Sequence, residues 1–125
     1  NRMIDNGKVL YLGVSDTPAW VVVKANEYAR QHGLTQFSVY QGQWSAAERD
    51  FERDILPMCQ EEGMGLAPWG PLGSGRFKSK EQRERGGDEG RKIPMYEKYE
   101  RVSEKLEAIA KKKDTLITSV VCNSS

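Results

Sequence analysis

The segment at residues 8–18 reads KVLYLGVSDTP and decides the fold class of the chain. From Val9 to Val14 its residues are apolar except for Gly13. Such an almost continuous apolar run is typical of a strand buried in a parallel sheet. Asn6-Gly7 precedes it, and a glycine just past a helix end adopts the left-handed conformation without strain. We therefore predict a strand over residues 8–14, followed by a helix over residues 18–31 that Thr17 caps.

The same order recurs twice more along the chain. Polar, helix-like stretches end in Gly33 and Gly63, and apolar runs follow at residues 37–41 and 64–68. The runs are about 26 to 30 residues apart, a spacing that favours strands alternating with helices. The sequence therefore predicts three parallel strands.

Two further helical stretches follow the second and third runs. Residues 48–62 are charged and helix-like, but Pro57 should break or restart the helix because it cannot donate the backbone hydrogen bond. A last helix is predicted over residues 95–113, where apolar residues step by three and four. Its predicted packing stripe consists of Tyr99, Val102, Leu106 and Ile109.

Two parallel folds fit this alternation. An eight-stranded (β/α) barrel uses about 250 residues, or about 31 for each unit, so three units would form part of one. A flavodoxin-like open sheet needs about five strands. In either fold, three parallel strands leave two unpaired edges, which favour self-association. We expect an α/β chain that forms one incomplete domain over residues 1–125 and can associate through its open edges.

The composition argues against several classes of function. The 125 residues carry a formal net charge of +1, with basic and acidic residues interspersed, so nucleic acid is not expected as a partner. No apolar stretch approaches the ~20 residues that span a bilayer, and residues 1–6 lack the centre of a secretory signal, so the cytosol is the expected compartment. Cys59, Cys122 and the single His32 favour neither a disulfide framework nor a metal site.

Polar side chains stand directly after the apolar runs. In parallel α/β folds the ligand binds at the carboxyl ends of the strands. The sequence places Ser15 and Asp16 after the first run, Gln41 at the end of the second and Trp69 after the third. Hydrogen-bonding groups beside a flat aromatic side chain suit a planar ring that carries an amide, such as nicotinamide. The alternatives are structural: a helix cap, ordinary polar strand ends, and a tryptophan buried in the core.

A glycine-rich segment follows Trp69. Residues 70–76 read GPLGSGR, in which the glycines let backbone N–H groups approach an anion and Arg76 adds positive charge. The whole of residues 71–94 is rich in glycine and charge and has no apolar stripe, so we expect a long loop there. A solvated loop is the main interpretation of its charged run, and a lid over a cofactor is the alternative.

Several of these motifs resemble one known family. The motifs at residues 13–16, 40–44 and 68–75 occur in the same order and spacing as strands five, six and seven of the aldo-keto reductases. Residues 16–20 and 49–54 look most like the fungal aryl-alcohol dehydrogenases and their relatives, such as the norsolorinic acid reductases. The likeness covers about residues 1–119 and implies part of a (β/α)8 TIM barrel.

The resemblance implies an NADP(H)-dependent oxidoreductase that interconverts aryl aldehydes or ketones and alcohols, all small molecules. Ser15, Asp16 and Gln41 would hold the nicotinamide carboxamide, and Trp69 would stack on its ring where most of the superfamily has tyrosine. Asp16 stands where asparagine is more common, and a carboxylate can only accept hydrogen bonds. The other cofactor-binding residues, most of them along the pyrophosphate, would be Gly70, Leu72, Gly73, Ser74, Gly75 and Arg76.

The resemblance assigns no catalytic residue to this chain. The family transfers hydride with a tyrosine proton donor, tuned by lysine and aspartate with a histidine nearby, all on strands two to four. None of the five tyrosines here is paired in sequence with such a lysine and aspartate. We therefore expect the isolated chain to be inactive. The alternative is a noncatalytic barrel fragment that acts, if at all, by associating with other chains.

Overall fold

The computed structural model describes residues 1–85 and 94–122 of the chain. The chain divides into two compact units. The first unit comprises Asn1–Trp44 and Arg49–Trp69, and the second comprises Ser45–Glu48 and Gly70–Ser125. Part of the loop predicted at residues 71–94 lies outside the described residues.

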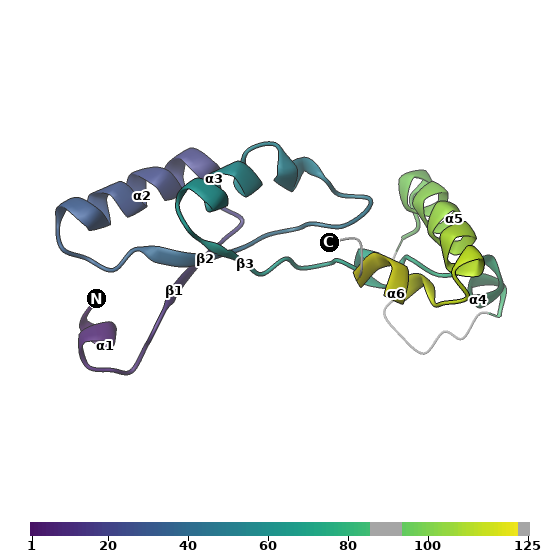
Figure 1. Ribbon diagram of the computed structural model, residues 1–125, viewed down its shortest axis with the longest axis horizontal. Coiled ribbons are helices and arrows are strands. Elements are labelled where there is room, and N and C mark those ends of the chain that lie inside the picture. The colour runs from purple at the N-terminus through teal and green to yellow at the C-terminus, as the bar shows by residue number, and fades with distance from the viewer. Residues whose placement is uncertain (86–93, 123–125) are drawn as a thin grey trace. The chain divides into compact units, whose positions relative to one another are not determined.

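The first unit is a three-stranded parallel sheet with helices on one face. Strands β1 (Leu12–Ser15), β2 (Phe37–Gln41) and β3 (Gly65–Leu66) lie in the order β1-β2-β3. Helices α2 (Ala19–Gln31) and α3 (Ile55–Glu61) lie on the same side of this sheet (Figure 1). The alternation of parallel strands with helices confirms the predicted parallel α/β class.

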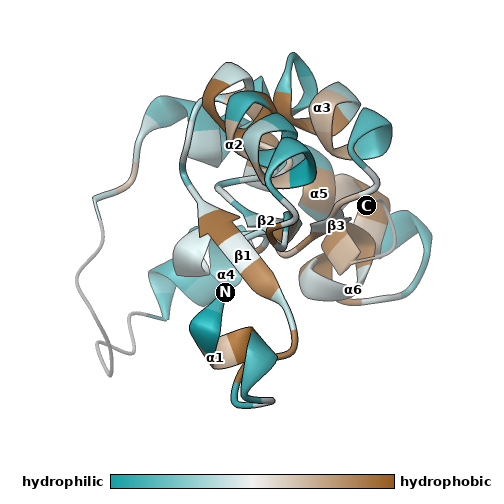
Figure 2. Cartoon of the chain, turned by 90° about the vertical axis from the view of Figure 1, so that its left-hand side faces the viewer, coloured by the Kyte–Doolittle hydropathy of each residue, from teal (hydrophilic) through white to brown (hydrophobic). Residues whose placement is uncertain are grey.

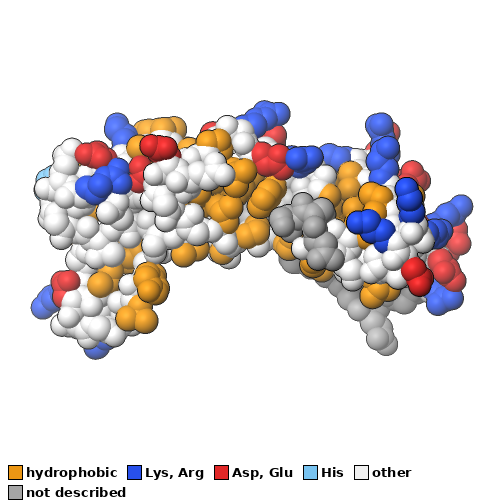
Figure 3. Space-filling view, in the orientation of Figure 1, with side chains coloured by type: hydrophobic (Ala, Val, Ile, Leu, Met, Phe, Trp, Pro, Cys, Tyr) orange, Lys and Arg blue, Asp and Glu red, His pale blue; other side chains and the backbone are white. Residues whose placement is uncertain are grey.

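The segment that leads into β1 differs from the prediction. A short helix, α1 (Arg2–Asp5), comes first, and β1 begins at Leu12 rather than at residue 8. Leu10 and Tyr11 are 77% and 75% exposed. No described strand pairs with them, so their apolar side chains stay uncovered. Figure 2 shows β1 as mostly hydrophobic, and Figure 3 shows hydrophobic side chains on the surface near α1.

The stretch predicted as an interrupted helix over residues 48–62 is a 3-10 turn, η1 (Asp50–Glu52), followed by α3. Pro57 lies in the first turn of α3, where a missing backbone N–H leaves no intrahelical bond unmade. The helix therefore restarts two residues before the proline, at Ile55.

The core of the first unit forms between the sheet and these helices. Tyr40 of β2 meets Phe51 of η1 edge to face, and Trp44 stacks on Phe51, with centroid distances of 5.6 Å in both pairs. Such aromatic pairs add to the stabilisation that burial gives. The other buried residues of this core are Val22, Ile55, Met58, Cys59 and Met64.

Asn26 is a polar residue of α2 that ties three elements of the first unit together. It is 1% exposed. Its Oδ1 accepts a hydrogen bond from the Phe37 backbone N–H at 2.9 Å, and its Nδ2 donates to the Glu62 carboxylate at 3.0 Å. Glu62, just after α3, also pairs with Arg30 of α2 at 2.9 Å. The network fixes α2 against the start of β2 and the end of α3.

The stability of the first unit should fall in acid because of Glu62. The hydrogen bond from Arg30, helped by the one from Asn26 and opposed by burial, lowers the pKa of Glu62 below its ordinary value. A carboxyl group with a lower pKa in the folded state stabilises the fold above its unfolded pKa, which is about 4.3, and this stabilisation is lost as the pH falls through the folded pKa.

Urea unfolding of the wild type and of Glu62→Gln between pH 7 and pH 3 measures this effect. The variant should be less stable at pH 7, and the difference should shrink on acidification. Glu61→Gln, at the exposed neighbouring position, is the matched control. A difference that stays constant over this range would show that Glu62 contributes no pH-dependent stability.

The described part of the second unit is helical. Its helices are η2 (Gly73–Gly75), α4 (Lys80–Glu84), α5 (Glu97–Lys112) and α6 (Ile117–Cys122). Helix α5 lies within the predicted range, but Ile109 is 42% exposed and Ala110 is buried in its place. The core consists of Phe77, Tyr99, Leu106, Ala110, Ile117 and Val121.

Helix α4 lies inside the segment predicted as a loop. The Ser79 hydroxyl accepts from the Gln82 backbone N–H at 3.1 Å, and the Gln82 side chain accepts from the Ser79 backbone N–H at 2.9 Å. This capping box satisfies two backbone donors at the helix start. Because α4 buries none of its residues, a search for an apolar stripe does not find it.

Candidate functional site

Ser15, Asp16 and Gln41 lie together at the carboxyl ends of β1 and β2. Ser15 pairs in register with Gln41. The Asp16 backbone N–H donates to the Gln41 carbonyl at 3.0 Å. All three residues are exposed. The structure therefore brings these predicted site residues together at one edge of the sheet, where a ligand can reach them.

The carboxylate of Asp16 accepts hydrogen bonds from two neighbouring side chains. Its Oδ2 accepts from the Ser15 hydroxyl at 3.2 Å, and its Oδ1 accepts from the Trp69 indole Nε1 at 3.3 Å. The backbone of Asp16 is left-handed, with φ 47°, which aspartate tolerates better than most residues other than glycine. Asp16 thus links the end of β1 to the residue that follows β3.

The backbone of Trp69 is held on both sides. Its N–H donates to the Gly42 carbonyl at 2.9 Å, and its carbonyl accepts from the Trp44 N–H at 3.3 Å. Trp69 is 39% exposed, so the structural alternative of a fully buried core tryptophan is wrong. Trp69 therefore has a backbone that hydrogen bonds hold in place and a side chain that a ligand can reach.

Thr17 does not cap α2 as predicted. Its hydroxyl donates to the Ser15 carbonyl at 2.9 Å, and no side chain caps the helix, which begins after Pro18. The left-handed turn at Asp16 leaves the Ser15 carbonyl within reach of this hydroxyl. The Tyr40 hydroxyl donates to the Thr17 carbonyl at 2.6 Å, and burial raises the pKa of Tyr40. These bonds hold the connection after β1 in place.

The glycine-rich residues belong to the second unit. Gly70, Gly73 and Gly75 all have positive φ, and so does Ser74 at 55°. Gly73 has a φ of 64°, which favours glycine, and a Cβ there would also come within 3.1 Å of the Phe77 ring, a tight contact. The turn therefore presents backbone rather than side chains along most of its length. Leu72, by contrast, packs against the core of this unit.

Arg76 is held against this turn. Its Nη1 donates to the Gly73 carbonyl at 3.2 Å, and its Nε donates to the Pro94 carbonyl at 3.0 Å. Its guanidinium lies 4.8 Å from the centroid of the Tyr99 ring, within the range of a cation–π interaction. The positive charge of Arg76 is therefore fixed beside the glycine turn.

A second group of charged residues lies around Tyr99, and no pattern in the sequence indicated it. The Tyr99 hydroxyl donates to the Glu48 carboxylate at 2.8 Å, and the Lys98 ammonium pairs with the same carboxylate at 2.7 Å. Tyr99 is 5% exposed, and burial, together with its bond to Glu48, raises its pKa. A buried tyrosine with a raised pKa is poorly suited to donate a proton to a substrate. Glu48 lies too far away in sequence for a local pattern to indicate the contact.

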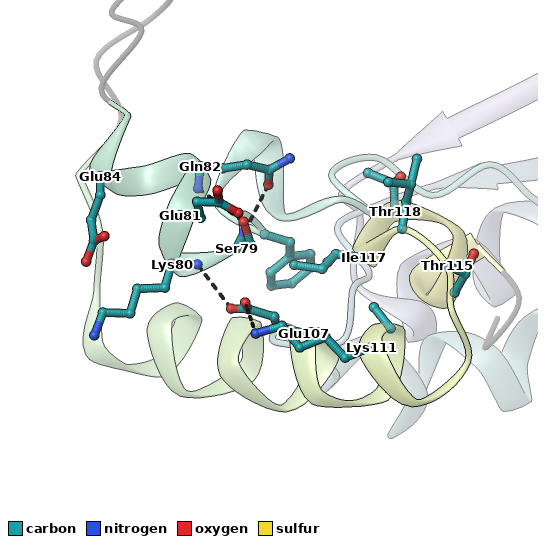
Figure 4. Close-up of a pocket in the computed structure, with 13 residues that line it drawn as sticks. Ser79, Lys80, Glu81, Gln82, Glu84, Glu107, Lys111, Thr115, Ile117 and Thr118 are labelled. Atoms are coloured by element: carbon teal, nitrogen blue, oxygen red, sulfur yellow. Dashed lines mark hydrogen bonds and ion pairs between the residues drawn. The ribbon is translucent and has the colours of Figure 1, made fainter.

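The second unit also contains a hollow of about 530 Å³ between α4, α5 and α6 (Figure 4). Glu107 accepts from the Lys80 backbone N–H at 3.0 Å and pairs with Lys111 at 2.8 Å, and the latter bond lowers the pKa of Glu107. The hollow contains none of the predicted site residues, and these charged groups already satisfy one another. The strand ends of the first unit are therefore the better candidate site.

The described residues show neither a metal site nor a membrane span. Within residues 1–85 and 94–122, no three His, Cys, Asp or Glu side chains gather closely enough to bind a metal ion. No helix in the same ranges is long and apolar enough to cross a bilayer.

Comparison with known proteins identifies the family. Residues 1–123 match the model of the aldo/keto reductase family. The chain is 64% identical to norsolorinic acid reductase A of Aspergillus parasiticus, over 96% of this chain and 30% of that protein. It is 55% identical to an aryl-alcohol dehydrogenase of Pestalotiopsis microspora, over 96% of this chain and 31% of the relative. The chain is 50% identical to a probable aryl-alcohol dehydrogenase of Saccharomyces cerevisiae, over 90% of this chain and 36% of the relative. The chain spans about a third of the length of these relatives, and it belongs to the aldo/keto reductase family.

Proposed function

We propose that the chain is part of a cytosolic NADPH-dependent oxidoreductase that interconverts aryl aldehydes or ketones and the corresponding alcohols. Its relatives include proteins named norsolorinic acid reductase and aryl-alcohol dehydrogenase. The observation that carries the proposal is the cluster of Ser15, Asp16, Gln41 and Trp69 at the carboxyl ends of parallel strands, the edge at which α/β folds bind ligands.

In this proposal the strand ends bind the nicotinamide half of the cofactor. The carboxamide has one acceptor and two donors, and Gln41 can match both kinds of group. The Ser15 hydroxyl, which donates to Asp16, would add an acceptor oxygen beside it. Trp69, which is 39% exposed, would stack on the nicotinamide ring, and the bound cofactor would supply or accept the hydride.

The second unit would bind the pyrophosphate with its glycine turn. The N–H groups of Gly73, Gly75 and Arg76 donate to the carbonyls of Gly70, Leu72 and Gly73 at 2.9, 3.3 and 3.1 Å, and an anion bound through them would have to replace these bonds. Leu72 and Arg76 flank the left-handed run of residues 73–75. The guanidinium of Arg76 would add charge attraction from a fixed position.

The proton donor for the carbonyl substrate would come from the rest of the whole protein. Tyr40 and Tyr99 are buried tyrosines with raised pKa values, and both hydroxyls are engaged by acceptors of this chain. We therefore propose that the chain supplies cofactor contacts and that, by itself, it does not turn over an aldehyde.

Trp69→Ala should weaken NADPH binding about tenfold or more, because stacking of an aromatic pair and burial of ring area are both lost. The quenching of tryptophan fluorescence during titration of the 125-residue chain with NADPH measures the affinity. Trp20→Ala is the control, since Trp20 is 66% exposed on α2. Equal affinities of Trp69→Ala and wild type would exclude the proposed stacking role.

A second candidate function is association with other chains through the open edges of the sheet. It is favoured by Leu10 and Tyr11, which are exposed apolar residues directly before β1. Sedimentation at increasing concentration should then show dimers that Leu10→Lys dissociates. A wild-type chain that stays monomeric at all concentrations would remove this candidate.

A further inference from the structure

We propose that Asp16 is a positioning residue, whose carboxylate fixes the Trp69 indole ring and the Ser15 hydroxyl in the orientations that a ligand meets. The inference rests on the proposed cofactor function and refines it. In place of a direct contact to the cofactor, it gives Asp16 a role that acts through two neighbours.

Asp16 constrains the ring of Trp69. Backbone bonds hold residue 69 on both sides, but they leave its side-chain torsions free. The indole N–H is the only polar atom of the ring, and its bond to Asp16 Oδ1 at 3.3 Å selects one ring plane. A ring already in place loses less conformational entropy when a ligand stacks on it. Trp69 is 39% exposed, so packing covers only part of the residue, and the hydrogen bond adds to the constraint that packing gives.

Asp16 also orients the hydroxyl of Ser15. It donates its proton to Asp16 Oδ2 at 3.2 Å, which leaves the lone pairs of its oxygen for an incoming N–H donor. The amino group of a carboxamide is such a donor, whereas a carboxylate is not. The negative charge of Asp16 would also repel a carboxylate. Asp16 should therefore favour an amide-bearing ring over an acid-bearing one.

An asparagine can replace Asp16 in both contacts only by reversing the one to Ser15. Its oxygen would accept from the Trp69 indole N–H, and its amino group would donate to the Ser15 hydroxyl, which can accept as well as donate. Asp16→Asn therefore keeps the shape of the side chain and its tolerance for positive φ but removes the negative charge and uses a lone pair of the Ser15 oxygen. Asp16→Gly keeps the left-handed backbone and removes both bonds.

Fluorine NMR of the chain labelled with 5-fluorotryptophan, without any ligand, tests the contact to the ring. Trp69→Phe identifies the Trp69 signal by its loss. In Asp16→Gly, this signal should move toward the position of a solvent-exposed indole, while the signals of Trp20 and Trp44 stay in place. It should move less in Asp16→Asn, because the amide oxygen can still accept from the indole N–H. An unchanged Trp69 signal in Asp16→Gly overturns the proposal. Because the measurement needs no ligand, it decides the role of Asp16 even if NADPH does not bind.

A double-mutant cycle of NADPH affinities tests whether Asp16 acts through Trp69. Asp16→Gly should weaken binding about threefold to tenfold in the wild type, the size of one hydrogen bond, and clearly less in Trp69→Phe. Equal losses in the two backgrounds would indicate a direct contact of Asp16 with the cofactor and would overturn the positioning role.

The nicotinic acid form of the cofactor, which carries a carboxylate in place of the carboxamide, tests the selectivity. The wild type should prefer the amide form about tenfold, and Asp16→Asn should narrow this ratio. The same ratio in wild type and variant would contradict the role assigned to Ser15 and Asp16. Failure of both forms to bind would instead refute the proposed cofactor function.

Discussion

Replacing Asn26 with alanine should lower the free energy of unfolding by about 3 kcal/mol, because the loss leaves buried polar groups without partners. The Phe37 N–H would lose its acceptor, and the Glu62 carboxylate would lose one of its donors. Alanine favours a helix more than asparagine does, which offsets the loss by about half a kcal/mol.

Urea unfolding at pH 7 measures this change. Gln31→Ala, on the same helix but exposed, is the control and should change the stability by less than about 0.5 kcal/mol. The free energy of unfolding should fall with urea concentration at the same slope in the wild type and in both variants. Equal slopes would show that the proteins unfold from comparable native states. A variant Asn26→Ala as stable as Gln31→Ala would mean that the buried network contributes little.

Gly42→Ala should destabilise the first unit by about 2 kcal/mol or more and should also disturb the candidate site. A Cβ at this position would lie 2.7 Å from Cε2 of Phe51 and 2.9 Å from Cε1 of Tyr40, both ring atoms of the core. Overpacking of this kind forces rings or backbone to move. Because the Gly42 carbonyl accepts from the Trp69 N–H, such a shift would reach the candidate stacking residue.

Gly65→Ala is the matched control for this substitution. Gly65 is also in the sheet region, but a Cβ there would meet its nearest atom, the Ser38 carbonyl oxygen, at 3.7 Å, an ordinary contact. Thermal unfolding should therefore separate the two alanine variants clearly. If both variants are destabilised equally, contact of the new methyl group with the two rings is not the cause of the destabilisation in Gly42→Ala.

The elements with the clearest periodicity could be predicted from the sequence. Strand β2 has the predicted bounds, since an apolar run of residues follows Gly33 and ends where polar residues begin. Helices α2 and α5 lie within one or two residues of the predicted ends because each carries an apolar stripe. By contrast, β1 starts late. An apolar run forms a strand only where another strand pairs with it, and no local pattern contains that information.

Part of the candidate site could also be predicted. Because ligands bind at the carboxyl ends of parallel strands, we predicted that Ser15, Asp16 and Gln41 lie together. In the structure they are neighbours at the ends of β1 and β2. The hydrogen bond from Trp69 to Asp16 joins residues far apart in sequence, and it depends on the left-handed turn at Asp16. That turn also prevents the predicted cap at Thr17, because it directs the hydroxyl to the Ser15 carbonyl.

Backbone amide NMR spectra of the 125-residue chain during titration with NADPH test the central claim most directly. Our account predicts that the signals of Ser15, Asp16, Gln41 and Trp69, including the Trp69 indole N–H, shift progressively and saturate. The signals of Lys80 and Glu107, which line the hollow of the second unit, should remain unchanged. Shifts confined to that hollow, or no shift in a folded chain, would contradict a cofactor site at the strand ends.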